Sequence, residues 1–212
     1  AKKVILTLAD NTTNTITDSS RLSTEEDYSA AIYSKEDLII NGNGTLNVNA
    51  GYRNGIKSTD DCIIVSGTLN ITSTEDGIIG KDLCGVVAGD ININAGSDGI
   101  KSTYDKDTTK GNVIIEGGNI TIKASNDGIQ AENILVINDG AINIKTNNGA
   151  ADTTQTHIDN MDMGRGGFGF NNNKTTTTTD DTSESRKGIK AGNMLIINDG
   201  DITIDSDDDS VH

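Results

Sequence analysis

Short runs in which apolar and polar residues alternate recur along the whole chain. In 68-TLNITS-73, Leu69 and Ile71 share one side of an extended backbone and the polar residues share the other, which is typical of a half-buried β-strand. Two shorter runs, 55-GIKS-58 and 62-CIIV-65, precede it, and Ser-Gly or Asn-Asp-Gly sequences punctuate such runs. No segment has helical periodicity. The pattern therefore predicts an all-β protein and argues against alternating strands and helices.

The runs repeat with a fixed period. Gly55, Gly77 and Gly99 each precede an isoleucine and lie 22 residues apart, and later repeats are longer only where loops are inserted. Three short strands in each repeat of about 22 residues predict a stacked solenoid, the parallel β-helix. We call each repeat a rung. An antiparallel sandwich or propeller would not keep the same face pattern at a constant spacing.

We expect a single β-helix domain over residues 1–212. Residues 1–30 form its N-terminal cap and first rung in this prediction. Residues 147–187 break the repeat with five consecutive threonines and a glycine-rich patch, a composition typical of low-complexity sequence. The segment is therefore predicted to be a flexible inserted loop.

Apolar residues at equivalent places in successive rungs are expected to stack in columns inside the solenoid, where each buried aliphatic side chain contributes roughly 1.5–3 kcal/mol. Cys62 and Cys84 align with inward leucines and are predicted to be buried thiols that act as small apolar groups, with an inter-rung disulfide as the second possibility. The predicted columns are Ile32, Ile56, Ile78, Ile100, Ile129 and Ile189; Leu46, Leu69, Ile91, Ile120, Ile142 and Ile202; and Val48, Ile71, Ile93, Ile122, Ile144 and Ile204.

Composition and charge narrow the function. The chain has 32 Asp and Glu against 17 Lys and Arg, a net charge of −15, which argues against nucleic-acid binding and for binding of cations. Aromatic residues are only 3%, so the core must be built from small aliphatic side chains. No apolar run approaches the roughly 20 residues of a membrane-spanning helix, so no membrane insertion is expected. The start at Ala1, without an initiator Met, suggests a processed or trimmed chain.

A column of aspartates precedes the glycines of successive rungs. Asp76, Asp98 and Asp127 are followed by Gly-Ile, and Glu75 lies beside the first of them. In a purely structural explanation, Asp forms a turn and Gly adopts a backbone conformation that few residues reach. Stacked carboxylates about 4.8 Å apart would, however, repel by about 1 kcal/mol in water and about 3–4 kcal/mol at an effective dielectric of 20. A hard cation removes that repulsion, so the column predicts a Ca²⁺ site.

A second acidic column follows the first strand of each rung. It contains Glu36, Asp60 and Asp82, and continues into an inserted loop with Asp105 and Asp107. Carboxylates of this kind are either further Ca²⁺ ligands or a solvated face. We include Asp105 and Asp107 among the candidate ligands. The few His and Cys residues do not form the cluster that a zinc site needs.

Basic and aromatic residues flank the acidic column. Lys57 and Lys101, with Arg53, are predicted to face an acidic polysaccharide, and the rings of Tyr33 and Tyr52 could receive sugar faces. The alternative is that the lysines neutralise the neighbouring aspartates and that the tyrosines only pack.

A polar ladder lies on the outward side of the third strand of each rung. In one explanation its side chains hydrogen-bond along the stack, and in the other the ladder is a flat platform for a crystalline glycan. The ladder comprises Asn47, Asn70, Asn92, Thr121, Asn143 and Thr203.

The order and spacing of these motifs are similar to those of the bacterial polysaccharide-lyase-like, β-helical carbohydrate-binding domain proteins. The resemblance covers the chain outside 147–187, and the runs that carry it include NGNGTLNV, NGIKSTDD, EDGIIGKD, KGNVIIEGGNITI and DSDDDSVH. It implies a right-handed parallel β-helix, a secreted or cell-surface protein, bound Ca²⁺, and binding of plant cell-wall polysaccharides such as cellulose or acidic, pectin-type glycans.

The same resemblance marks individual positions. Asp76, Asp98, Asp127 and Asp209 match the family's Asp-Gly-Ile-type turns, whereas Asn54 and Lys187 replace the aspartate in two others. The family pattern also suggests a further rung after the last residue, so the chain is expected to be a fragment of a longer β-helix.

Three functional classes follow. The favoured one is a non-catalytic, Ca²⁺-binding polysaccharide-binding protein, with no catalytic residue assigned. The second is a Ca²⁺-dependent pectate-type lyase, which needs a lysine or arginine base with a lowered pKa, whereas a lysine among carboxylates, such as Lys101, should have a raised one. The third is a structural surface adhesin or spike. The sequence contains no indication of the oligomeric state.

Overall fold

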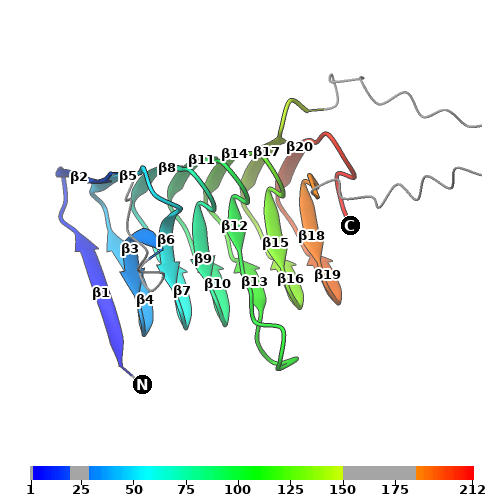
Figure 1. The fold of residues 1–212 in the computed structure, drawn as a ribbon, viewed down its shortest axis with the longest axis horizontal. Coiled ribbons are helices and arrows are strands. Elements are labelled where there is room, and N and C mark those ends of the chain that lie inside the picture. Colours follow the sequence, from blue (N-terminus) through cyan, green and yellow to red (C-terminus); the bar gives the residue numbers. More distant parts are fainter. Residues whose placement is uncertain (1, 20–28, 150–184) are drawn as a thin grey trace, which may run out of the picture.

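The computed structural model describes residues 2–19, 29–149 and 185–212, which form twenty strands and no helix. Every strand pairs in parallel with its neighbours, and the strands belong to three sheets that run along the solenoid (Figure 1). The predicted all-β parallel β-helix, with three strands in each rung, is confirmed. No helix able to cross a membrane is present in the described part of the chain.

Sheet A contains the strand that, from β4 onward, follows the short Gly-Ile strand of its rung and precedes the long alternating strand. Its strands are β1 (Lys3–Leu8), β4 (Asp37–Gly42), β7 (Asp61–Ile64), β10 (Leu83–Val86), β13 (Asn112–Ile115), β16 (Ile134–Ile137) and β19 (Met194–Ile197).

Sheet B contains the long alternating strands. Its strands are β2 (Thr13–Asp18), β5 (Thr45–Ala50), β8 (Thr68–Ser73), β11 (Asp90–Ala95), β14 (Asn119–Ala124), β17 (Ala141–Thr146) and β20 (Asp201–Asp205).

Sheet C contains the short strands that carry the Gly-Ile motif. Its strands are β3 (Ala30–Ser34), β6 (Asn54–Ser58), β9 (Ile78–Gly80), β12 (Ile100–Lys101), β15 (Ile129–Ala131) and β18 (Ile189–Ala191).

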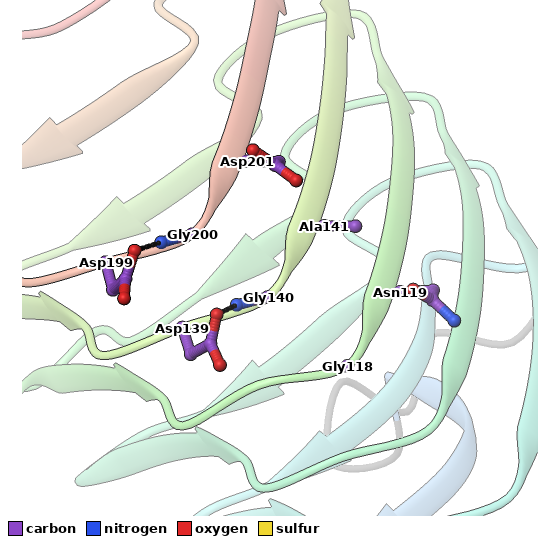
Figure 2. Close-up of a pocket in the computed structure, with 8 residues that line it drawn as sticks. All are labelled: Gly118, Asn119, Asp139, Gly140, Ala141, Asp199, Gly200 and Asp201. Atoms are coloured by element: carbon purple, nitrogen blue, oxygen red, sulfur yellow. Dashed lines mark hydrogen bonds between the residues drawn. The ribbon is translucent and has the colours of Figure 1, made fainter.

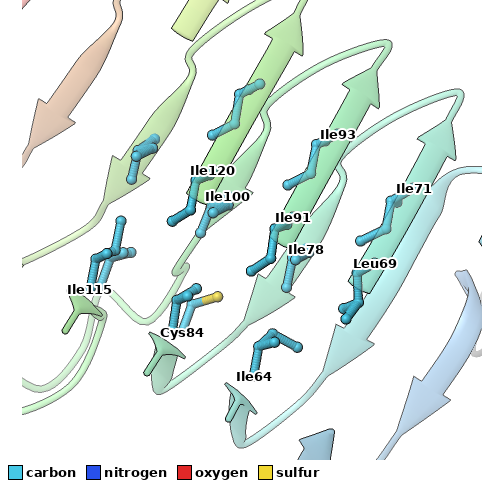
Figure 3. Close-up of a cluster of buried hydrophobic side chains, with 14 of the residues drawn as sticks. Ile64, Leu69, Ile71, Ile78, Cys84, Ile91, Ile93, Ile100, Ile115 and Ile120 are labelled. Atoms are coloured by element: carbon cyan, nitrogen blue, oxygen red, sulfur yellow. The ribbon is translucent and has the colours of Figure 1, made fainter. Parts of the chain in front are cut away.

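The predicted columns lie in the core, although Ile32, Ile202 and Ile204 near the ends are only partly buried, and apolar residues of sheet A complete the core. Ile56, Ile78 and Ile100 are register partners in sheet C and are fully buried. The Leu69–Ile91 pair stacks likewise in sheet B, and Figure 3 shows this pair beside Ile78 and Ile100. A period of 22 residues thus places one isoleucine above another, and each rung covers the apolar surface of the next.

Cys62 and Cys84 are register partners in sheet A, and both are buried free thiols. Burial raises the pKa of both thiols, that of Cys84 to about 12. They therefore fill the core as small apolar groups, as the sequence pattern predicted.

The glycine before each of these isoleucines is required by space. A Cβ atom on Gly77 would lie 2.5 Å from the carbonyl oxygen of Gly99 and 2.5 Å from Cγ2 of Ile93. Gly77 does not have a positive φ, so the expectation that it adopts an unusual backbone conformation is wrong. The glycines instead let successive backbones and the sheet B isoleucines approach closely.

The two ends of the predicted domain differ in what can be described. Strands β1 and β2 pair with β4 and β5, so residues before Asp18 form a first rung. Of the predicted loop at 147–187, residues 150–184 lie outside the described part, and its flexibility stays a prediction.

Candidate acidic column and outer polar face

The aspartates of the Asp-Gly-Ile motif stack along one edge of sheet C. The Oδ1 atom of Asp76 accepts a hydrogen bond from the backbone N–H of Asp98 at 3.0 Å, and Asp98 accepts one from Asp127 at 2.9 Å. Asp127 in turn accepts the backbone N–H of Lys187 at 2.8 Å. Each carboxylate thus satisfies a backbone donor of the following rung.

The two departures from aspartate in this column have structural reasons. Asn54 Oδ1 accepts the backbone N–H of Asp76 at 3.0 Å, while its Nδ2 donates to the carbonyl of Ser29 at 2.7 Å. A carboxylate could not make that second bond. At the other end, Lys187 contributes its backbone N–H to the column, and its ammonium group pairs with Asp208 at 2.6 Å.

Lysines of sheet C form ion pairs with the second oxygen of the buried carboxylates. Lys101 Nζ lies 2.5 Å from Asp98 Oδ2, and Lys190 Nζ lies 3.3 Å from Asp127 Oδ2. Asp98 is 4% and Asp127 1% exposed. Burial raises the pKa of Asp98 despite the opposing effect of Lys101. Burial acts to lower the pKa of Lys101, but the charges of Asp98 and Asp76 outweigh it, so the pKa is raised, as expected from the sequence.

This arrangement bears on where Ca²⁺ would fit. At Asp98 and Asp127 one oxygen holds a backbone N–H and the other faces an ammonium group, so a cation there would have to displace a lysine. Glu75 lies beside Asp76, and its carboxylate is 3.8 Å from Arg53 Nε. The buried part of the column is therefore complete as a ladder of hydrogen bonds and ion pairs.

The other two predicted Ca²⁺ ligands lie elsewhere. Asp105 and Asp107 follow β12, at the end of that strand opposite to Asp98, and both are exposed. They line a hollow of ≈ 270 Å³ with Tyr104 and Glu132, and Asp107 accepts hydrogen bonds from Thr109. The six predicted ligands are thus not brought to one place.

Another acidic group does converge. Asp37, Asp60 and Asp61 each offer a carboxylate oxygen within 4.8 Å of the others, and they form the one such group in the described part of the chain. Burial, and then a hydrogen bond with Asp82, raise the pKa of Asp60; burial also raises that of Asp61. The sequence placed Asp60 in the second acidic column but did not foresee Asp37 beside it.

Of the predicted sugar-binding residues, Tyr33, Lys57 and Lys101 lie in strands of sheet C, and Tyr52 and Arg53 lie in the turn before β6. Tyr33 and Lys57 are register partners, and Lys57 Nζ donates to Ser29 Oγ at 3.0 Å. Burial lowers the pKa of Lys57. The guanidinium of Arg53 lies 5.4 Å from the centre of the Tyr52 ring. Because Lys101 is held by Asp98, the five residues do not form one continuous basic surface.

The polar ladder of sheet B is confirmed. Asn70 Nδ2 donates to Asn47 Oδ1 at 2.9 Å, and Asn92 Nδ2 donates to Asn70 Oδ1 at 3.0 Å. The register continues this ladder through Thr121, Asn143 and Thr203. The amides bond to one another along the stack, as the first explanation expected, and the role of this face as a glycan platform stays a prediction.

A second outward column runs beside this ladder, two residues further along each strand, and the sequence reasoning did not identify it. It passes from neutral residues to two lysines and then to an aspartate. Its members are Thr17, Asn49, Thr72, Asn94, Lys123, Lys145 and Asp205. Because side chains two residues apart in a strand point to the same side, counting two residues beyond the ladder would have identified this column from the sequence.

Shallow hollows lie along this face. One of ≈ 270 Å³ is lined by residues of both outward columns, among them Thr72, Asn92 and Lys123. A neighbouring one of ≈ 340 Å³ is lined by Asn94, Lys123, Lys145 and residues at the ends of their strands.

A third hollow, of ≈ 370 Å³, lies at the corner between sheets A and B (Figure 2). Its polar side chains are acidic or amide, namely Asn119, Asp139, Asp199 and Asp201. Asp139 and Asp199 each accept the backbone N–H of the following glycine, which is typical of a turn. Their oxygens therefore have a structural role, and the acidic surface is unsuited to an anionic ligand.

Comparison with solved structures agrees with this architecture. The chain is similar to the polysaccharide lyase-like protein from C. thermocellum, whose structure was determined as a gadolinium derivative. The two share 27% sequence identity with a TM-score of 0.70 over 94% of this chain and 68% of that one. The fold and its polar face thus define a polysaccharide lyase-like β-helix.

The family follows from the sequence match. The model for carbohydrate-binding domain-containing proteins matches residues 1–212, so the chain belongs to that family. A protein of the same description from Acetivibrio thermocellus is 39% identical over 75 residues, which is 34% of this chain and 26% of that protein. The chain thus spans about a quarter of the length of this relative.

Proposed function

We propose that this chain is a secreted or cell-surface protein that binds plant cell-wall polysaccharide, cellulose or an acidic pectin-type glycan, on the outer face of sheet B. The observation that carries the proposal is the outward ladder of amide and hydroxyl side chains, which repeats at every rung, together with the second polar column beside it. Membership of a carbohydrate-binding family supports the substrate class.

The geometry suits an extended polymer. Neighbouring strands lie about 4.8 Å apart, so a glycan laid along the solenoid axis would meet equivalent amide and hydroxyl groups at each rung. Thr72, Asn92 and Asn94 are exposed there, while the alternating isoleucines Ile71 and Ile93 are buried. Amides and hydroxyls both donate and accept, as recognition of sugar hydroxyls requires.

Retention on insoluble polysaccharide tests this proposal. The protein would be incubated with cellulose and with cross-linked polygalacturonate, and the bound fraction measured against protein concentration. Thr72→Glu and Asn94→Glu place a carboxylate on the proposed face and should weaken retention by about tenfold, equivalent to about 1.4 kcal/mol. Thr7→Glu is the matched control, because Thr7 is an exposed strand residue on the outer side of sheet A.

The outcomes separate the functional classes. Weakened retention of the two sheet B variants, with Thr7→Glu unchanged, supports the proposal. Equal retention of all three refutes the assignment to sheet B. If the wild type is not retained on either polysaccharide, the glycan-binding function is refuted and the structural adhesin is favoured.

We also propose that Ca²⁺ binds to the acidic groups, as the excess of carboxylates and their stacking suggest. The candidates are the column containing Asp76 and Asp98 and the convergent group of Asp37, Asp60 and Asp61. Calorimetric titration of chelated protein with Ca²⁺ tests this, with Asp76→Asn and Asp60→Asn to locate the site. Absence of heat above the dilution control refutes Ca²⁺ binding.

One observation keeps lyase activity as a second candidate. A base that removes a proton from a uronate needs a lowered pKa, and burial lowers that of Lys57, which lies near Asp76 and Glu75. Incubation with polygalacturonate and Ca²⁺, followed by the ultraviolet absorbance of unsaturated product, tests it. Product formation that is lost in Lys57→Met would support the lyase, and absence of product in the wild type refutes it.

A further inference from the structure

Two lysines lie side by side on the outer face of sheet B. Lys123 in β14 and Lys145 in β17 are direct register partners, and they form the one lysine–lysine register pair among the described strands. Ile122 and Ile144 next to them are buried, so both lysines lie on the outward side of the sheet. In a chain with a net charge of −15, this places two lysine side chains on adjacent strands, whose backbones lie about 4.8 Å apart.

The surroundings of the two lysines differ. Lys145 Nζ is 3.1 Å from Asp205 Oδ2, so its charge is partly balanced. Lys123 is exposed, and no acidic partner is found for it in the part of the chain that the structure describes. Both line the hollow of ≈ 340 Å³ together with Asn94, Ser125 and Asn147, whose side chains offer further hydrogen-bonding groups.

The charges along the column give the site a direction. Toward the N-terminal rungs, Lys123 is followed by the neutral residues Asn94 and Thr72. Toward the C-terminal rung, Lys145 is followed by Asp205. An anionic group is therefore attracted between the lysines, and the polymer that carries it is favoured on the neutral side and repelled on the acidic side.

We infer that Lys123 and Lys145 form an anion subsite that takes a carboxylate or sulfate group of a bound glycan, with the neutral residues of the glycan extending over Asn94 and Thr72. This inference rests on the proposed function, because it places the charged group of the same polymer on the same face. Ammonium groups bind such anions through charge-assisted hydrogen bonds, which are among the stronger polar contacts.

The first test uses soluble oligosaccharides. Binding of oligogalacturonate, dextran sulfate and a neutral cello-oligosaccharide would be measured by calorimetry at two salt concentrations. The double variant Lys123→Gln/Lys145→Gln should lose affinity for at least one anionic ligand by about tenfold or more and keep its affinity for the neutral one. The control Lys3→Gln/Lys106→Gln removes the same charge at two exposed positions.

The two anionic ligands distinguish the source of the anion, since loss confined to one of them identifies a carboxylate or a sulfate ester. Unchanged affinity of the double variant for both anionic ligands would overturn the inference. So would an equal loss for neutral and anionic ligands, or the same loss in the control.

A second test does not depend on glycan binding. Titration of isotope-labelled protein with sodium sulfate and with sodium acetate, against sodium chloride at equal ionic strength, should shift the backbone amide resonances of Lys123 and Lys145. Shifts without any oligosaccharide binding would refute the proposed function and retain the anion subsite. Absence of shifts with both anions would refute the subsite even if glycans bind.

Discussion

Replacing Asp98 by asparagine or by alanine separates the two contacts that its carboxylate makes. One oxygen accepts the backbone N–H of Asp127 at 2.9 Å, and the other pairs with Lys101. Asparagine keeps a carbonyl oxygen for the backbone bond and removes the charge. Alanine removes both contacts. An asparagine already makes the equivalent bond in this column, because the amide oxygen of Asn54 accepts the backbone N–H of Asp76.

The magnitudes follow from burial. Asp127 is 1% exposed, so alanine at position 98 leaves a buried N–H without an acceptor, which costs about 1–3 kcal/mol. Burial raises the pKa of Asp98, so folding disfavours its ionised form and the loss of its charge has little adverse effect. Lys101 keeps the attraction of Asp76 and Asp127. We therefore expect Asp98→Asn to remain within about 1 kcal/mol of the wild type, the usual net contribution of one hydrogen bond.

Urea unfolding at pH 7, followed by circular dichroism, measures both variants by linear extrapolation. Asp90→Ala serves as the control, because this exposed aspartate accepts only a surface hydrogen bond from Asn119, and its removal should change stability by about 0.5 kcal/mol or less. If Asp98→Asn is as destabilised as Asp98→Ala, the charge rather than the acceptor stabilises the column, and the reasoning is refuted.

The pH dependence gives an independent check on the same residue. Because the folded pKa of Asp98 lies above its ordinary value of 3.8, its contribution to stability is full below pH 3.8 and is lost as pH rises through the folded pKa. Asp98→Asn has no such proton to lose. The stability of the wild type relative to this variant should therefore fall between pH 3.8 and pH 7, and a rise would contradict the raised pKa.

Three further outcomes are expected. Lys57 should react with an amine-modifying ester at lower pH than Lys101, because burial lowers the first pKa and carboxylates raise the second, and peptide mass spectrometry over a pH series would reveal the reverse order if this is wrong. If the acidic column binds Ca²⁺, Lys101→Met should tighten uptake by freeing an oxygen of Asp98, whereas weaker or unchanged uptake in calorimetry would place the cation elsewhere. Gly77→Ala should lower the melting temperature strongly, because its Cβ would lie 2.5 Å from each of two atoms. Gly85→Ala should be tolerated, because the nearest atom to its Cβ would be 3.6 Å away. Equal effects of the two substitutions on the melting temperature would contradict the close approach at Gly77.

The sequence was sufficient for the fold because the fold is repetitive. A spacing of 22 residues and strict alternation decide which side chains stack, and the observed pairs Ile56–Ile78 and Leu69–Ile91 follow directly. The same offsets placed the Asp76, Asp98 and Asp127 column. Periodicity thus predicts position along and across the solenoid.

Periodicity does not predict which atoms a side chain contacts. The bond from each column carboxylate to a backbone N–H depends on the turn geometry, and the ion pair of Lys101 depends on rotamers. The group of Asp37, Asp60 and Asp61 lies at the starts of the adjacent strands β4 and β7 and joins two neighbouring columns, which no single column reveals. The pairing of Lys123 with Lys145 could have been predicted from the sequence, because both lie two residues beyond the recognised ladder.

The hydrogen bonds of the aspartate column connect each rung only to its immediate neighbour. Asp76 reaches the rung of Asp98, and Asp98 reaches that of Asp127, without any contact that skips a level. A whole rung can therefore be duplicated or deleted in a gene without disturbing the others, because the new neighbours present the same donor and acceptor. The length of the outer faces is then set by the number of copies, and each additional 22 codons would extend them by about 4.8 Å.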